Sequence, residues 1–263
     1  MTFSPSSFDR DRAQPYTCAE CPPTPTLPAG QGGIDLAALK DVLCALGQVT
    51  RLPDLGQHGP LLASAGESSL FHCLFGRDSL RMSLDLLHDF PSVARATLRE
   101  LAHLQGLTVN PRAEEEPGRI LHEHRRAGDP LLKELEKHWS FPYYGAVDST
   151  PQWINLLAAY TNRFGDEILS TPLTDRRGHP LTLLDSLRAA LGWISGRLDD
   201  PRAGGFLWVQ RASPDGIPNQ VWEDSPDSYY HASGALFDFT KPYAPIAVQG
   251  YVYDALVGAA EIL

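Results

Sequence analysis

The sequence has little cysteine, and this scarcity excludes one class of small protein. Cys18, Cys21, Cys44 and Cys73 are the only cysteines among 263 residues, too few for a fold held together by disulfides. Cys18 and Cys21 have the spacing of metal ligands, but no second pair of this kind completes a tetrahedral site. We therefore expect neither a disulfide scaffold nor a metal centre, and no cofactor.

Positive charge and long apolar runs are also scarce. Lys and Arg number 22 against 32 Asp and Glu, so the net charge is −10. A chain of this charge repels phosphate backbones and anionic lipids, and we expect it to bind neither nucleic acid nor a membrane. No apolar run is long enough to cross a bilayer, and Met1 to Pro5 lack the basic and apolar regions of a signal peptide. These features predict a soluble, cytoplasmic protein.

Proline is concentrated near the start of the chain. The first thirty residues hold six of the 22 prolines, a composition that continues neither a helix nor a strand ladder. We interpret residues 1–33 as a Pro-rich flexible arm. The length of the rest suffices for a sizeable core, and we expect a folded domain over residues 34–263.

Apolar residues at helical spacing are the main structural signal in this domain. The expected helices are one that ends at Gly47, one capped by Asp78, and others that begin at Ser92, at Ser149 or Thr150, at Thr182 and at Pro245. Strand patterns are nearly absent, and Gly205–Val209 is the one fair candidate. The predicted fold class is all-α.

Two long connections separate these helices, and long connections in a domain usually carry function. They span residues 107–148 and 199–244. The last helical stripe stops at Ile262 and Leu263 without a glycine or a basic residue, which is unusual for a helix end. We interpret this as an interrupted helix and expect the chain to be a shortened version of a longer one.

Three clusters of aromatic, acidic and Arg residues occur where a loop leads into a helix or into a Pro-rich turn. They are FGRDSL (75–80), YYGAVDSTP (143–151) and NQVWEDSPDS (219–228). Aromatic faces stack on sugar rings, and carboxylates and Arg bind sugar hydroxyls. A carboxylate held against an indole loses solvation and stays protonated, as a general acid must. Each cluster alone also fits a simpler interpretation, namely an N-cap at Asp78, core packing of Tyr143 and Tyr144, and an acidic surface turn around Glu223.

Taken in order, the motifs resemble one protein family. FGRDSL, EEPGRILHE (115–123), YYGAVDSTP, NQVWEDSPDS and PIAVQGYVYDAL (245–256) are similar to motifs of the bacterial amylo-α-1,6-glucosidases, which are related to glycogen debranching enzymes. The likeness runs from about Leu70 to the last residue. It implies an (α/α)6 toroid of the six-hairpin glycosidases, of which this chain would contain the N-terminal part. A toroid needs twelve helices, and the sequence predicts about six or seven.

The resemblance also implies roles for individual residues. Asp224 would be the general acid, with Glu223 as the competitor, because in glucoamylases the acid directly follows the Trp. The expected sugar-binding residues are Arg77, Asp78, Tyr144, Asp148, Trp208 and Trp222. The family cleaves with inversion, so a second carboxylate would activate water on the opposite face of the sugar. The substrate class implied is α-1,6- or α-1,4-glucosidic oligosaccharides or branch points.

Three departures from the family pattern stand out. Ala247 occupies a position where relatives often have Glu, and Glu223 one where many carry Lys. The general base of this group comes from a late hairpin, beyond the end of this chain. The base would therefore come from a complementary C-terminal chain, or the protein lacks it.

Two other functions stay open. One is a non-catalytic glycan-binding remnant that keeps Arg77, Asp78 and the aromatic residues but lacks the second carboxylate. The other is a sugar epimerase or lyase on the same toroid, with His122, His124 or His231 transferring the proton. An incomplete toroid would also expose an apolar edge, so we expect the chain to self-associate or to need a partner chain.

Overall fold

The computed structural model describes residues 71–263, except 224 and 226. All of them belong to one compact unit, Val49–Leu263. The predicted arm, the boundary at residue 33 and the helix that ends at Gly47 lie outside the described residues. So does Asp224, the predicted general acid.

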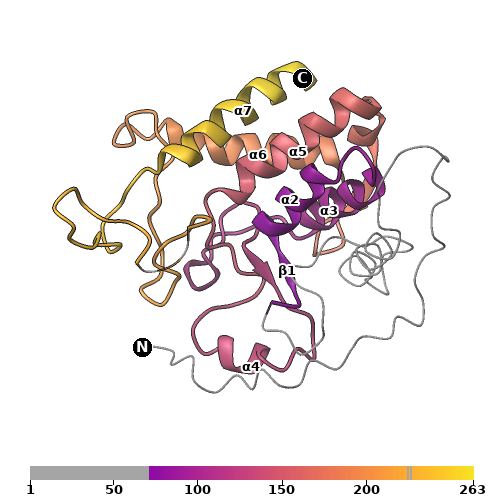
Figure 1. Cartoon of the computed structure of the whole chain (residues 1–263). Coiled ribbons are helices and arrows are strands. Elements are labelled where there is room, and N and C mark those ends of the chain that lie inside the picture. The colour runs from indigo at the N-terminus through magenta and orange to yellow at the C-terminus, as the bar shows by residue number, and fades with distance from the viewer. Residues whose placement is uncertain (1–70, 224, 226) are drawn as a thin grey trace, which may run out of the picture. The chain divides into compact units, whose positions relative to one another are not determined.

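The described part is mostly helical (Figure 1). Its longer helices are α2 (Gly76–Asp85), α3 (Pro91–His103), α5 (Ser149–Phe164), α6 (Leu183–Leu198) and α7 (Ile246–Ile262), with a single turn α4 (Leu132–Leu135). Two short antiparallel strand pairs join β1 (Leu74–Phe75) to β2 (Glu123–His124) and, as a hairpin, β3 (Pro172–Thr174) to β4 (Pro180–Thr182). Two 3-10 turns are η1 (Pro111–Ala113) and η2 (Asp166–Ser170).

The starts of three predicted helices agree with the structure. Thr182 caps α6 by accepting a hydrogen bond from the Asp185 backbone N–H, and the Asp185 carboxylate accepts one from the Thr182 backbone in return. This capping box satisfies two of the helix's open donors. Ser149 is the first residue of α5, and Pro245 directly precedes α7.

The prediction that Asp78 caps its helix is wrong. Phe75 is the N-cap residue, and Asp78 lies exposed within the first turn of α2. The cause is the β1–β2 pairing, which ends at Phe75, so that the helix begins immediately after the strand. The negative charge of Asp78 still interacts favourably with the positive end of the helix dipole. Its side chain, however, does not determine where the helix begins.

The predicted strand Gly205–Val209 is also not formed as such. Val209 makes only an isolated bridge to Tyr243. The amide of Gln249 on α7 binds both the N–H and the C=O of Leu207, at 2.9 and 3.0 Å. Because a side chain satisfies this backbone, no neighbouring strand is needed.

Helix α5 is the centre of the packing. It contacts α2, α3, α6 and α7. Its apolar side chains Trp153, Ile154 and Leu157 are fully buried, and the Trp153 indole N–H donates to the Leu98 carbonyl on α3 at 3.1 Å. The predicted apolar stripe of this helix is therefore its buried face.

Gly76 is required where α2 passes Leu121. A Cβ at this position would lie 2.1 Å from the Leu121 carbonyl oxygen, which is backbone and cannot move aside freely. We expect Gly76→Ala to lower the free energy of unfolding by about 1–3 kcal/mol, the usual effect of overpacking. Gly192, exposed in α6, has open space around it, so Gly192→Ala should raise stability by about 0.5–1 kcal/mol. Urea unfolding of both variants measures the contrast, and equal effects would contradict it.

Candidate functional site

Two of the sequence clusters meet at the starts of α2 and α5. The Arg77 guanidinium lies 3.3 Å from Asp148 Oδ1, and both side chains are buried. Burial raises the pKa of Asp148, against the effects of Arg77 and of the Trp222 backbone N–H. This pair therefore joins FGRDSL to YYGAVDSTP, 71 residues apart in the chain.

His122 lies next to this ion pair. It is buried, its ring contacts Phe75 and Tyr143 edge-on, and its pKa is well below the usual range because of burial and the nearby Arg77. The imidazole is therefore neutral at neutral pH and adds no further positive charge beside Arg77.

The third cluster joins the other two through the backbone. The Val147 N–H donates to the Gln220 carbonyl at 2.9 Å. The Trp222 backbone N–H is hydrogen-bonded to the Asp148 carboxylate, which acts against the rise of its pKa caused by burial. The Trp222 side chain is 55% exposed. An indole with an open face therefore lies in the loop that contacts the buried Asp148.

Side-chain hydrogen bonds hold the turn that carries Glu223. The Asn219 amide and the Ser228 hydroxyl both donate to the Glu223 carbonyl, the latter at 2.7 Å. Tyr243 donates its hydroxyl to Asn219. The Glu223 side chain is itself half-buried.

An aromatic cluster adjoins this turn, and the sequence analysis missed it. Tyr229, Phe237, Phe239 and Tyr243 have ring centroids 5.1–5.8 Å apart. Burial raises the pKa of Tyr229, and a hydrogen bond to Glu223 raises it further. Burial also raises the pKa of Tyr243, with Tyr229 and Asp148 adding to it. In the sequence, the alternation Phe237-Asp238-Phe239 was the pattern that could have indicated this aromatic cluster.

The remaining predicted site residues lie elsewhere. Tyr144 is fully buried in the core, and its hydroxyl donates to the Leu104 carbonyl at 2.6 Å. No face of it is open to a sugar, so it takes the core role considered in the sequence analysis. Trp208 is half-buried and donates to the Ala203 carbonyl at 2.8 Å. Asp78 is exposed, and Asp224 is outside the described residues.

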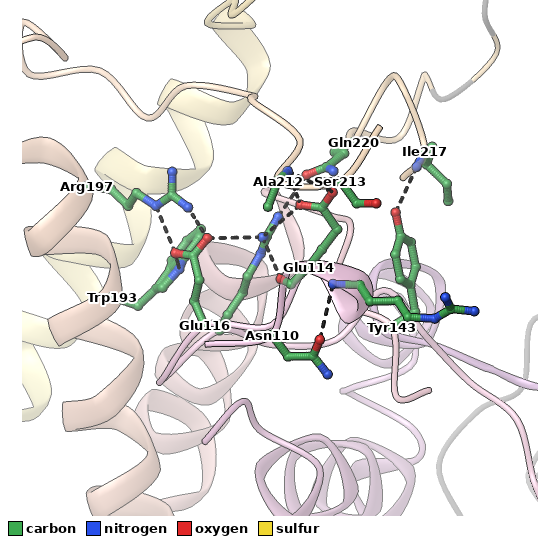
Figure 2. A network of polar contacts seen from close by, with 12 residues as sticks. Asn110, Glu114, Glu116, Tyr143, Trp193, Arg197, Ala212, Ser213, Ile217 and Gln220 are labelled. Carbon is green, nitrogen blue, oxygen red and sulfur yellow. Dashed lines mark hydrogen bonds and ion pairs between the residues drawn. The ribbon is translucent and has the colours of Figure 1, made fainter. Parts of the chain in front are cut away.

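Glu114 and the EEPGR segment that follows it bind the 199–244 loop to the helices rather than lining the site. Glu114 accepts hydrogen bonds from the backbone of Ala212 and Ser213 at 2.8–3.0 Å. Glu116 accepts from the Trp193 indole at 2.8 Å and pairs with Arg197 (Figure 2).

Arg119 connects this network to the site. It is 1% exposed and donates to Gln220 Oε1 and to the Glu114 carbonyl, each at 2.9 Å. Because Gln220 in turn binds Val147, the network determines where the loop with Trp222 and Glu223 lies beside Asp148.

Metal sites and membrane spans were sought in the described residues alone. No group of three or more His, Cys, Asp or Glu in the described residues could hold a metal ion. No helix in this part of the chain is both long and apolar enough to cross a bilayer. No known family model matches the chain, and no curated protein matches it either.

Proposed function

We propose that the chain is a cytoplasmic glycoside hydrolase-like protein of carbohydrate metabolism, acting on α-1,6- or α-1,4-glucosidic oligosaccharides or branch points. The observation that carries the proposal is the meeting of the three clusters. Arg77 and Asp148 form a buried pair, and the loop with Trp222 and Glu223 contacts it. This combines the Arg77 guanidinium, held by Asp148, for sugar hydroxyls with an exposed indole face for a sugar ring.

The helix packing supports an (α/α)6 toroid, in which alternate helices form the inner ring. α2 contacts α5, and α5 contacts α7, while α3 and α6 pack beside them. The Arg77–Asp148 pair lies at the N-terminal ends of α2 and α5. We assign α2, α5 and α7 to the inner ring. The site then lies at the end of the ring where α2 and α5 begin.

In this proposal, Asp224 donates a proton to the leaving glycosidic oxygen. A second carboxylate activates water on the opposite face, roughly 6.5–9.5 Å from the acid, and the anomeric configuration inverts. Asp148 is fully buried and paired with Arg77, so it holds the Arg77 guanidinium in place rather than activating water. No cofactor takes part.

The test is glucose release from a panel of α-1,4 and α-1,6 gluco-oligosaccharides. We expect Asp224→Asn to reduce the rate about a hundredfold or more, since this is what a positioned general acid contributes. Asp227→Asn, an exposed position in the same turn, is the matched control and should keep the activity.

Other outcomes would redirect the assignment. Full activity in Asp224→Asn together with its loss in Glu223→Gln would move the acid to Glu223. Saturable oligosaccharide binding without turnover would favour the glycan-binding alternative. An isomerised product would favour an epimerase, although the buried, neutral His122 makes no hydrogen bond through Nδ1 within the described residues and His231 is exposed.

We also propose that the chain self-associates through α7. This helix has apolar side chains on its exposed side as well as on its buried side, whereas the exposed side of a surface helix is usually polar. Val248, Val252 and Ala255 are buried, yet Ile246 and Tyr253 are 86% and 69% exposed. Light scattering should show a mass above that of the monomer, and Tyr253→Lys should reduce it. A monodisperse, heat-stable monomer would contradict this expectation.

A further inference from the structure

A large groove lies beside α3, away from the residues assigned above. Its volume is about 1430 Å³. Its walls are the outer face of α3, residues 124–127 and the β3–β4 hairpin. The ionisable side chains that line it are Arg95, Arg99, Glu100, His103, His124 and Arg126.

The groove is basic in a strongly acidic protein. Three arginines face it against the single carboxylate of Glu100, although acidic residues outnumber basic ones 32 to 22 in the chain. Arg99 and Arg126 are exposed, and in the described part of the chain neither side chain has an ion-pair or hydrogen-bond partner. Their guanidinium groups are therefore available to a ligand.

The walls are held in place by side-chain contacts. Arg95 donates to the Tyr160 hydroxyl at 3.3 Å, which fixes its guanidinium against α5. A ring nitrogen of His103 lies 2.7 Å from the Thr174 carbonyl and ties α3 to β3. The groove is thus shaped before any ligand enters, which reduces the entropic cost of binding.

Two further groups in the groove suit a ligand with hydroxyls. Burial lowers the pKa of His124 to about 4, with Arg126 and His103 adding to the shift, so this imidazole is neutral. Its Nδ1 atom is buried, with no hydrogen-bond partner in residues 71–263. The Glu100 carboxyl can accept hydrogen bonds from hydroxyl groups, and its pKa is raised, chiefly by burial.

We propose that this groove binds a sugar phosphate, with Arg99 and Arg126 holding the phosphate and Glu100 and His124 contacting the sugar hydroxyls. Guanidinium groups match phosphate oxygens in charge and in their forked geometry. The carboxylate in the groove disfavours a ligand that is anionic along its whole length. The proposal does not depend on the glycosidase assignment, because the two sites share no residue.

The test is calorimetric titration of the full chain with glucose 1-phosphate, glucose and inorganic phosphate. We expect saturable binding of glucose 1-phosphate that weakens at high salt, weaker binding of phosphate and none of glucose. Arg99→Glu/Arg126→Glu should weaken the binding of glucose 1-phosphate about tenfold or more. Arg188→Glu/Arg202→Glu changes the charge equally at exposed positions outside the groove and should leave the binding unchanged.

Further outcomes decide between the parts of the proposal. Absence of saturable glucose 1-phosphate binding, or equal weakening in both double variants, would overturn it. Phosphate bound as tightly as glucose 1-phosphate would overturn the contact with the sugar. Glu100→Gln should leave phosphate binding intact or tighter and reduce the preference for the sugar phosphate, and an unchanged preference would remove Glu100 from the site.

Discussion

Replacing Arg119 with methionine is expected to lower the free energy of unfolding by about 3–5 kcal/mol, the usual cost of removing one partner from a buried charged network. The side chain is 1% exposed and lies 3.5 Å from Glu116 Oε1. Methionine fills much of the volume but donates no hydrogen bond. The Glu114 carbonyl and the Gln220 amide oxygen would each lose a buried donor.

The measurement is urea unfolding followed by circular dichroism. Arg188→Met is the control, because its side chain is 62% exposed and pairs with Asp185 only at 3.8 Å. Such surface pairs contribute little, so we expect a change within about 0.5 kcal/mol. If both variants lost the same small amount of stability, the Arg119 network would not hold the 199–244 loop in place.

Replacing Arg77 with methionine should also lower stability by about 3–5 kcal/mol at neutral pH. The variant leaves Asp148 as a buried carboxylate without the guanidinium that lies 3.3 Å from it. The loss should shrink toward about pH 4, near the ordinary pKa of an Asp, because a protonated carboxyl is much less costly to bury than a carboxylate.

The direction in which this stability loss changes with pH follows from the pKa of Asp148. Burial already raises this pKa in the native protein, and Arg77 acts against the rise. Without Arg77 the folded-state pKa rises further above the unfolded value. A group whose pKa is higher in the folded than in the unfolded protein stabilises the fold at pH values below its pKa in the unfolded protein. This stabilisation is lost as the pH rises through its pKa in the folded protein.

Unfolding of Arg77→Met at several pH values measures this effect. Arg81→Met on the same helix is the control, since that side chain is 66% exposed and pairs with Asp85 at the surface. A stability loss that stays constant between about pH 4 and neutral pH would mean that Asp148 is not ionised in the native protein.

Much of the helical structure could be predicted because its determinants are local. The apolar spacing around Trp153 and the cap at Thr182 act within one or two turns of the chain. Asp78 shows where this reasoning fails. Its helix begins earlier because β1 pairs with β2, a contact between residues about fifty positions apart.

The candidate site shows the same division between local and distant determinants. Arg77, Asp148 and Trp222 could be singled out by residue type and by their places in loops, and the structure brings these three together. Tyr144 lies in a sequence context that equally indicates a sugar site, yet it is fully buried and its hydroxyl donates to the Leu104 carbonyl. Residue type does not distinguish a site tyrosine from a core tyrosine, because burial depends on distant parts of the chain.

The amino-acid order alone therefore decides the helical class, most helix starts and the two long loops, since these depend on neighbours within a few residues. Tertiary packing alone decides which loops meet. The Arg77–Asp148 pair, the contact between the Tyr229 and Tyr243 rings and the anchoring of Gln220 by Arg119 join residues 14 to 101 positions apart. Such contacts form only when folding has brought separate parts of the chain together, and no periodicity in the sequence encodes them.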